Sequence, residues 1–482
     1  MGISKCKMKI MKKKVAIIGA GPAGLAAAYE FYKQKKLKDF NVEVFESDSQ
    51  VGGISKTLLY KGYRFDLGGH RFYSKFNEIN NFYKDFLGKN MLKRKRLSRI
   101  YYNNKFYNYP LSARNVFSNL GFSKSFIITI SWLFRRLNQY ENEKTYDKWV
   151  SNRFGDEIFN MFFKSYTENL WGIPASRLSA DWAAQRIQNY DFVKAVINAL
   201  FGINPGSVKT IIDSFYYPKY GPGMLYDEMK RVLQENGVVF HLNTEIVSIV
   251  YEKGKVRKVI AKNRTSGKSV QHELDFLISS MPLNKLVISL GANNTLKTEI
   301  NKLKFRNFLT VNMIIKSNPF PDNWIYIHNP GVKVLRMQNF RNWSPYMAKK
   351  GSENTPIAME YFAYESDKIW NAKDEEIINK AKKEIESIGL AKKNSVIDAF
   401  VHRVRNAYPV YDSGYGIAVK AAKDYLRGFS NLFVCGRGGL FRYNNMDHSI
   451  LTGFYVARNI ISGENKFDVW SVNEKESYLE KT

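Results

Sequence analysis

The strongest constraint on the fold of this chain is a glycine-rich turn near its N-terminus. Residues 15–18 are typical of a short buried strand, Gly19, Gly21 and Gly24 have the spacing G-x-G-x-x-G, and residues 25–33 favour a helix. Glycines at this spacing permit a tight turn and a close approach of the backbone to a pyrophosphate, and the helix N-terminus offers free N–H groups. The predicted cofactor contacts in this turn are Gly19, Gly21, Pro22, Ala23 and Gly24.

A second strand pattern supports this interpretation. Residues 41–45 are typical of a strand, and Glu46 follows directly. A carboxylate about 20 residues past the last glycine is where dinucleotide sites place the acceptor for a ribose hydroxyl. A purely structural glycine-rich turn would explain neither the second strand nor the carboxylate. We therefore predict a Rossmann-type dinucleotide site with Glu46 at the ribose.

Composition adds a strong basic charge. The chain has 482 residues, enough for two to four domains, and 74 Lys and Arg against 44 Asp and Glu give a net charge of +30. This balance points either to a polyanionic partner or to compositional bias. Because the lysines are spread along the chain, we favour bias and expect no nucleic-acid partner. The densest run, residues 93–96, leads into two strand-like runs around a turn, which predicts a hairpin.

The few cysteines and histidines and the short apolar segments exclude several classes of protein. Cys6 and Cys435 cannot form a disulfide framework, and six histidines without metal-ligand spacing predict no metal site. A reducing cytoplasm is the expected location. No apolar run reaches the length of about 20 residues that a membrane span needs. The apolar stretch 126–134 and the basic charge leave room for peripheral membrane association.

Two further segments identify the cofactor by resemblance. Gly52-Gly53 and the run F-D-L-G-G-H at residues 65–70 resemble flavoproteins of the amine oxidase and protoporphyrinogen oxidase superfamily. The resemblance implies FAD, with the flavin near Gly53, Gly68, Gly69 and His70, although a plain packing role for His70 is as compatible with the sequence. It also implies that Ile246 lies on the adenine side. No second dinucleotide fingerprint follows, so any NAD(P)H would bind transiently as a reductant.

The middle of the chain carries an aromatic stripe. Residues 162–172 read F-F-K-S-Y-T-E-N-L-W-G, and Arg186 follows among apolar neighbours. Such a stripe is more often core than ligand cradle, but a buried guanidinium needs a carboxylate or an anionic ligand. The segment resembles UDP-galactopyranose mutases. The resemblance implies that Phe162 and Phe163 flank the uracil, that Tyr166 and Trp171 line the sugar pocket, and that Arg186 binds the diphosphate.

Two looser matches extend this substrate site. L-K-F-R at residues 303–306 resembles a mutase segment whose arginine meets the diphosphate, which would be Arg306 here; a surface arginine is the alternative. Tyr408-Pro409 matches the Tyr-Pro of the same family, in which the tyrosine also reaches the diphosphate.

The C-terminal block carries the most specific match. Residues 436–447 read G-R-x-G-x-x-R-Y-x-x-M-D, as in bacterial mutases, and the ending D-H-S resembles the eukaryotic form. Asp447 or Ser449 is expected to cap the following helix. Asn445 stands where the bacterial family has an acidic residue beside the sugar. The implied substrate contacts are Tyr443 and Asn445, and the implied FAD contacts are Gly436, Arg437, Met446, Asp447 and Ser449.

These observations predict an α/β fold with a discontinuous Rossmann-type FAD-binding domain, a helical domain and an antiparallel-sheet substrate domain. The FAD domain is expected at residues 13–92, 224–284 and 396–465. The helical substrate-capping domain is expected at 111–213, and the sheet domain at 93–110, 214–223 and 285–395.

The resemblance implies an FAD-dependent pyranose–furanose mutase acting on a UDP-linked sugar for surface-polysaccharide assembly. Reduced flavin N5 would be the nucleophile at the anomeric carbon, and the protein would orient the substrate and stabilise charge. The implied catalytic residues are His70, Arg186, Arg306 and Arg437. The alternative is an FAD-dependent oxidoreductase of the amine oxidase and protoporphyrinogen oxidase type. The sequence leaves open the sugar, the physiological reductant and whether the protein forms a homo-oligomer.

Overall fold

The computed structural model describes residues 11–109, 113–187 and 214–473, with only the backbone at 113, 114 and 184–187. The chain forms two compact units, each built from segments that are far apart in the sequence. Unit 1 comprises residues 1–53, 226–301 and 419–472, and unit 2 comprises residues 54–225, 302–418 and 473–482.

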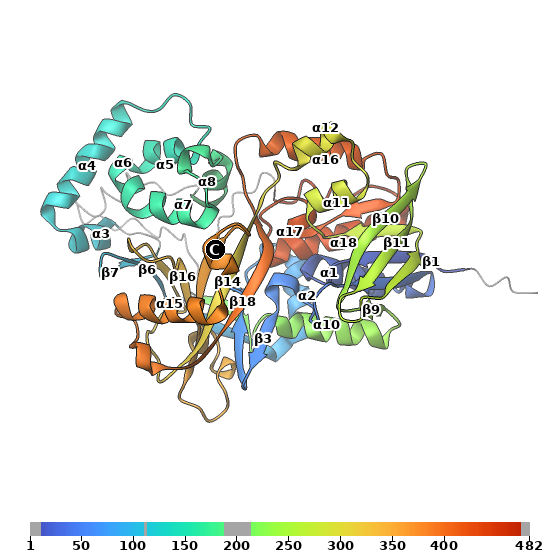
Figure 1. Ribbon diagram of the computed structural model, residues 1–482, viewed down its shortest axis with the longest axis horizontal. Helices are drawn as coiled ribbons and strands as arrows, with labels where there is room; N and C mark the ends of the chain where they lie inside the picture. The colour runs from blue at the N-terminus through green and yellow to red at the C-terminus, as the bar shows by residue number, and fades with distance from the viewer. Residues whose placement is uncertain (1–10, 110–112, 188–213, 474–482) are drawn as a thin grey trace, which may run out of the picture. The chain divides into compact units, whose positions relative to one another are not determined.

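Unit 1 is built on a five-stranded parallel sheet with the order β19-β13-β1-β2-β9. The central strand β1 (Lys13–Ile18) pairs with β2 (Phe40–Phe45) on one side and β13 (Phe276–Ser279) on the other. The outer strands are β9 (Val239–His241) and β19 (Leu432–Val434). The sheet is therefore assembled from three distant parts of the chain, which have different colours in Figure 1. A parallel sheet of this kind is buried on both faces, which is why β1 reads as a continuous apolar run.

Two helices of unit 1 pack unusually closely. A Cβ on Gly453 of α18 (Met446–Ser462) would lie 2.2 Å from the carbonyl oxygen of Ala23 in α1 (Pro22–Lys33). Further along the same pair, Arg458 Nε donates to Glu30 Oε1 at 2.9 Å. Only glycine allows the backbones to approach this far, and the ion pair then neutralises Glu30, which is buried.

The rest of unit 1 is a three-stranded antiparallel sheet and short helices. The sheet consists of β10 (Thr244–Glu252), β11 (Lys255–Asn263) and β12 (Ser269–Glu273). The helices are α11 (Leu283–Ser289), α12 (Asn294–Ile300) and α17 (Gly436–Gly439). Helices α10 (Gly223–Glu235) and α16 (Tyr415–Leu426) begin in unit 2 and continue in unit 1.

Unit 2 is built on a seven-stranded sheet with the order β18-β14-β17-β16-β15-β6-β7. Its strands are antiparallel except for the parallel pair β15 and β6. The bounds are β6 (Ser98–Tyr102), β7 (Lys105–Asn108), β14 (Phe305–Ile315), β15 (Trp324–Ile327), β16 (Arg336–Asn339), β17 (Thr355–Ala363) and β18 (Val396–Pro409). Every residue of β14 and β17 is buried, so both faces of the sheet centre are covered.

Different elements of unit 2 cover the two faces of this sheet. On one face, Ile377, Ala381 and Ile385 of α15 (Asp374–Ser387) pack in a core cluster with alternate residues of β14. The core on the other face includes Phe65, Tyr217 and neighbouring aromatic residues from two small two-stranded sheets. These pair β3 (Thr57–Tyr60) with β4 (Tyr63–Asp66) and β5 (Met91–Lys95) with β8 (Ser214–Pro218).

A group of helices lies at the β6–β7 end of unit 2 in Figure 1. They are α3 (Ala113–Leu120), α4 (Phe122–Leu137), α5 (Tyr146–Phe154), α6 (Asp156–Ile158), the π-helix η4 (Phe159–Lys164), α7 (Ser165–Trp171) and α8 (Ala180–Ile187). The remaining helices of unit 2 include α2 (Asn77–Leu87), α13 (Phe340–Trp343) and α14 (Lys368–Asn371).

The predicted fold class is confirmed: the chain is α/β, with a Rossmann-like parallel sheet and separate antiparallel sheets. The segment boundaries differ from those expected. Residues 54–92 belong to unit 2, the helices and the large sheet share that unit, and β18 is a strand of the large sheet rather than of the parallel one. The predicted hairpin after the basic run is confirmed as β6–β7, with Asn103 and Asn104 at positive φ in its two-residue turn.

None of the described helices is long and apolar enough to cross a membrane. Helix α4 exposes several large apolar side chains, among them Phe122, Ile130 and Leu137. They recur every three or four residues along one face of this helix, as in helices that lie on a membrane surface. Peripheral association with a membrane stays a prediction.

The close helix contact in unit 1 predicts a strong effect of one added methyl group. Gly453→Ala should lower the free energy of unfolding by about 1–3 kcal/mol, because the new Cβ must push α18 away from the backbone of α1. Chemical denaturation checks this. The matched control is Gly416→Ala in α16, where an added Cβ meets nothing within 4 Å and stability should stay equal or rise slightly. Equal stabilities for the two variants would contradict the proposed packing constraint.

Candidate functional site

The glycine turn of unit 1 forms the carboxyl edge of the parallel sheet. Gly19 has φ +96°, and a Cβ there would lie 2.2 Å from Ser280 Oγ. A Cβ on Gly24 would lie 1.9 Å from the carbonyl oxygen of Gly19, so α1 begins directly against the end of β1. A Cβ on Gly21 would be 3.9 Å from Cα of Gly53. The structure thus brings the first glycine motif and Gly53 together, with Pro22 and Ala23 in the first turn of α1.

Glu46 lies beside this turn, as predicted. Its Oε2 accepts the N–H of Ala20 at 2.7 Å, and its Oε1 accepts the N–H of Asp48 at 2.9 Å. Oε1 also accepts from the hydroxyl of Ser47 at 3.2 Å, so Oε2 is the oxygen with a lone pair left for a ribose hydroxyl. The carboxylate therefore holds the glycine turn and presents one acceptor at the same edge.

The C-terminal block reaches this edge of unit 1 as well. Gly436 has φ +75°, a Cβ on it would lie 2.9 Å from Cβ of Ala23, and its N–H donates to Thr452 Oγ1 at 2.9 Å. Arg437 Nε donates to the carbonyl oxygen of Asn444 at 2.9 Å, and its guanidinium lies 4.7 Å from the ring centre of Tyr443. The Gly436 turn and the Arg437 guanidinium thus lie beside the start of α1, where dinucleotide sites hold a pyrophosphate.

The predicted cap of α18 is wrong. The helix begins at Met446, so Asn445 is the N-cap residue, and its side chain makes no capping hydrogen bond. Asp447 and Ser449 lie inside the first turn and are buried. Ile246, expected near the adenine, lies on β10 and pairs with Ala261 of β11.

In unit 2, the G-G-H run packs against the large sheet. Gly68 has φ +96°, and a Cβ there would be 3.3 Å from Glu360 Oε1 of β17. A Cβ on Gly69 would be 3.2 Å from the indole ring of Trp343. His70 Nε2 lies 3.0 Å from the carbonyl oxygen of Leu67, so one ring nitrogen is bound within the loop.

A buried charged network lies behind this loop. Arg336 on β16 contacts Glu360 Oε2 with Nη2 at 2.5 Å and with Nε at 2.8 Å, and Gln338 also donates to Glu360. Burial raises the pKa of Glu360, while Arg336 opposes that shift. Arg336 Nη2 also donates to the hydroxyl oxygen of Tyr408 at 3.1 Å. Sequence reasoning found Tyr408 but missed the other members of the network; a glutamate in the apolar run of β17 was the available signal.

Two predicted sugar-pocket residues approach this network. Trp171 meets the ring of Tyr408 edge-on, with ring centres 6.5 Å apart. Its indole N–H is buried and has no hydrogen-bond partner in the described part of the chain, which is unusual for a buried donor. Tyr166 stacks on His328 at 4.4 Å, and burial raises its pKa well above the ordinary value, with Arg336 opposing. The structure therefore brings Tyr166, Trp171 and Tyr408 to one charged network.

The predicted uracil-flanking pair is placed differently. Phe162 is buried between Tyr102 and Tyr107, with ring centres 5.4 Å and 5.1 Å away, so it belongs to the core. Phe163 packs against Phe154 at 5.4 Å. Both residues lie in the π-helix η4, where the wider turn changes which side chains face inward.

Arg306 is neither a surface residue nor an open anion site. Its guanidinium donates to the carbonyl oxygens of Leu170, Asn169 and Phe362 and to Asp367 Oδ2. Burial lowers its pKa, and the contacts with Tyr364 and Asp367 oppose the shift. This arrangement favours a structural role at the end of α7. The backbone of Arg186 lies in α8, but its side chain lies outside the described residues.

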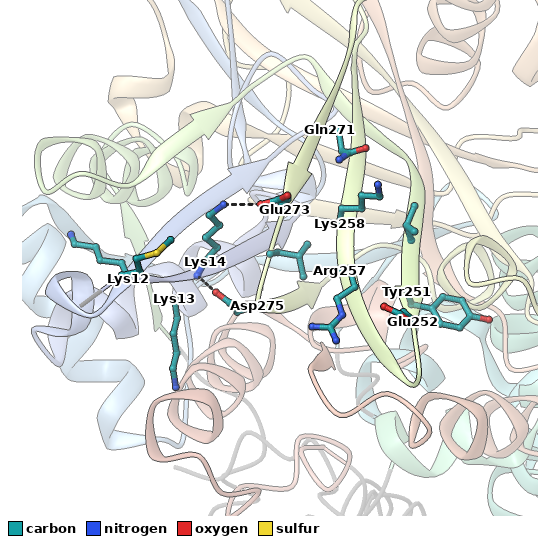
Figure 2. Close-up of a pocket in the computed structure, with 13 residues that line it drawn as sticks. Lys12, Lys13, Lys14, Tyr251, Glu252, Arg257, Lys258, Gln271, Glu273 and Asp275 are labelled. Atoms are coloured by element: carbon teal, nitrogen blue, oxygen red, sulfur yellow. Dashed lines mark hydrogen bonds and ion pairs between the residues drawn. The ribbon is translucent and has the colours of Figure 1, made fainter. Parts of the chain in front are cut away.

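A cavity of about 670 Å³ lies elsewhere in unit 1, at the amino end of β1 (Figure 2). Its lining holds five basic and three acidic side chains, and Lys14 contacts Glu273 at 3.2 Å. Because parallel sheets bind nucleotides at their carboxyl ends, this cavity is not the predicted cofactor site.

A family model for flavin-containing amine oxidoreductases matches residues 22–461. The chain belongs to this family. The match implies FAD, and a glycine turn at the carboxyl edge of a parallel sheet with the Glu46 carboxylate beside it fits the pyrophosphate and ribose of such a dinucleotide.

Solved structures show the same fold at low sequence identity. A reduced UDP-galactopyranose mutase aligns with a TM-score of 0.83 and 18% identity over 96% of this chain and 97% of that one. A putative protoporphyrinogen oxidase from Exiguobacterium sp. 255-15 aligns with a TM-score of 0.72 and 15% identity, over 94% of this chain and 100% of that one.

Curated relatives match only in short segments. Protoporphyrinogen oxidase 2 of Arabidopsis thaliana is 43% identical over 58 residues, which is 12% of this chain and 11% of that protein. Prenylcysteine oxidase 1 of Homo sapiens is 38% identical over 72 residues, 15% of this chain and 14% of that protein. The matched segments thus cover only about a tenth to a seventh of these relatives.

Asp66, directly before the G-G-H loop, predicts a pH-dependent stability. It is buried, accepts from Tyr217 and Thr57, and burial raises its pKa to about 7. Because the folded pKa lies above the unfolded value of 3.8, native protein loses stability as pH rises from about 4 to about 7. Asp66→Asn removes this titration. Its stability relative to wild type should therefore improve over that range by up to about 4 kcal/mol.

Denaturant unfolding of both proteins at several pH values measures the difference. Because the two proteins share all other titrating groups, a difference in the pH dependence of their stability comes from Asp66. A stability difference that does not change with pH would contradict a raised pKa at Asp66.

Proposed function

We propose that this protein is an FAD-dependent mutase that interconverts the pyranose and furanose forms of a UDP-linked sugar for surface-polysaccharide biosynthesis. The observation that carries the proposal is the chain of contacts within unit 2 from Trp171 to Tyr408 and from Tyr408 to Arg336. Aromatic surfaces beside arginine, tyrosine and indole hydrogen-bond donors suit a nucleotide diphosphate sugar. The similarity in fold to a UDP-galactopyranose mutase agrees with this proposal.

The cofactor would be held by unit 1 through the glycine turn, Glu46 and the Gly436 loop. FAD bound in its reduced form supplies the nucleophilic nitrogen that the reaction needs at the anomeric carbon. The protein's task is to orient the sugar and to hold the charge of the departing diphosphate. In unit 1, Arg437 is proposed to stabilise the negative charge of the diphosphate. Its guanidinium is held by the carbonyl oxygen of Asn444 and the ring of Tyr443.

In unit 2, the proposed substrate contacts are Tyr166, Trp171 and Tyr408. The hydroxyl oxygen of Tyr408 accepts from Arg336, which polarises its O–H as a donor toward an anion. The buried indole N–H of Trp171 is a second donor. In this proposal both groups bind and orient the substrate.

A second candidate is an FAD-dependent oxidoreductase of the amine oxidase and protoporphyrinogen oxidase type. The family match and the short segments shared with curated oxidases favour it. The glycine turn and the G-G-H loop would serve either reaction. For the mutase, NAD(P)H is proposed only as a transient reductant. We further propose a cytoplasmic location and leave room for a homo-oligomer.

An anaerobic assay separates the two reactions. The purified flavoprotein is incubated with UDP-galactose and other UDP-sugars, either oxidised or reduced with dithionite, and the products are separated by chromatography. A mutase converts a UDP-sugar to its furanose isomer only when reduced. Reduction of the flavin by an organic substrate that leaves oxidised, with no isomer in any condition, would support the oxidoreductase and contradict the mutase.

Arg437→Ala should lower kcat/KM for the UDP-sugar by about 2–4 kcal/mol of transition-state stabilisation, because the diphosphate loses a fixed guanidinium. The same loss is expected for Arg186→Ala. Steady-state kinetics on FAD-loaded protein measures it. The control is Arg442→Ala, since Arg442 donates to the carbonyl oxygens of Trp470 and Val472 and is proposed to act only in folding. Wild-type turnover in FAD-loaded Arg437→Ala would remove the proposed role.

A further inference from the structure

Three metal-ligating side chains from distant parts of the sequence meet in unit 1. Glu43 lies on β2, His241 on β9 and His272 on β12. The carboxylate oxygen Oε2 of Glu43 is 2.8 Å from His241 Nε2 and 3.1 Å from His272 Nδ1. All three donor atoms lie within 4.8 Å of one another. No motif spacing could reveal this group, because strand pairing alone brings it together.

The aromatic ring of Phe45 orients the two imidazoles. Phe45 pairs with His241 across β2 and β9, and their rings stack at 4.6 Å with 9° between the planes. His272 meets the same Phe45 ring edge-on at 4.9 Å. The imidazoles are thus held from behind by packing, while their nitrogens converge on one carboxylate oxygen.

The group is also open to solvent. The side chains of His241, Glu43 and His272 are 29%, 23% and 20% exposed. Successive side chains of a strand alternate between faces, so His272 points away from the face of Gln271 and Glu273, which line the cavity of Figure 2. A ligand would therefore reach the three donors from water and not through that cavity.

We propose that Glu43, His241 and His272 bind a divalent transition-metal ion of the zinc type. Two imidazole nitrogens and one carboxylate oxygen are a donor set that Zn²⁺ prefers, with water completing the shell. Tetrahedral coordination at about 2.0–2.2 Å separates neighbouring donor atoms by about 3.4 Å. The observed 2.8 Å and 3.1 Å are hydrogen-bond distances, so small side-chain rotations convert the hydrogen-bonded group into a coordinating one.

Such an ion would cross-link the parallel sheet to the antiparallel sheet of unit 1. The metal site would also be connected to Glu46, the predicted ribose ligand, because the N–H of Glu46 donates to the carbonyl oxygen of His241 at 2.9 Å. Metal binding to the folded protein should therefore raise its thermal stability. This inference is independent of the reaction that the enzyme catalyses.

The test uses full-length, tag-free, FAD-loaded protein freed of metal with a chelator. Calorimetric titration with Zn²⁺ is expected to show one ion per chain, and Co²⁺ is expected to give the visible spectrum of a tetrahedral site. His272→Gln and His241→Gln should each weaken Zn²⁺ binding at least ten-fold and abolish the rise in Tm with Zn²⁺. Glu43→Gln should weaken Zn²⁺ binding as well.

The matched control is His402→Gln, which removes a histidine of β18 in unit 2 and should leave Zn²⁺ affinity unchanged. Flavin absorbance and far-UV circular dichroism establish that each variant is folded. Two outcomes would overturn the proposal: no Zn²⁺ binding by the wild type, or equal affinity in the wild type and a folded double variant lacking both His241 and His272.

Discussion

The packing of unit 1 depends on backbone contacts at the start of α1 that leave no room for a Cβ. Gly24 brings α1 against the carbonyl of Gly19, and Gly453 brings α18 against the carbonyl of Ala23 on the other side. Because α18 and β19 come from the far end of the chain, these contacts join the two ends of the sequence around one sheet. The same close packing lies at the carboxyl edge of the sheet, where dinucleotide-binding sheets hold a pyrophosphate.

The nucleotide part of the site could be predicted because its information is local. The spacing of Gly19, Gly21 and Gly24, with Glu46 after the next strand, determines which groups reach one edge of a parallel sheet. The substrate part could be predicted less well. Phe162 lies in a π-helical turn and in the core, and carbonyl groups of α7 and β17 enclose Arg306. Neither effect leaves a periodic signal in the sequence.

Strand pairing explains why the sequence analysis missed two further groups of residues. Arg336 and Glu360 face each other only because β16 and β17 pair at that register, and Glu43 meets two histidines only because β2, β9 and β12 converge. A buried ion pair of this kind costs desolvation energy, which hydrophobic residues of the same size would avoid. Groups with shifted pKa values also gather at functional sites more often than elsewhere. The position of Glu360 against the Gly68 loop fits that tendency.

The choice between the two candidate reactions therefore rests on unit 2. Every member of a flavin family needs the glycine turn, so unit 1 cannot separate a mutase from an oxidase. An apolar substrate cannot accept hydrogen bonds from a guanidinium and a tyrosine hydroxyl. An enzyme for such a substrate would therefore pay for burying these polar groups and gain no binding energy from them. A diphosphate sugar has the charge and the hydrogen-bond acceptors that Arg336, Tyr408 and the indole N–H of Trp171 can satisfy. This difference in polarity is the physical argument for a nucleotide sugar.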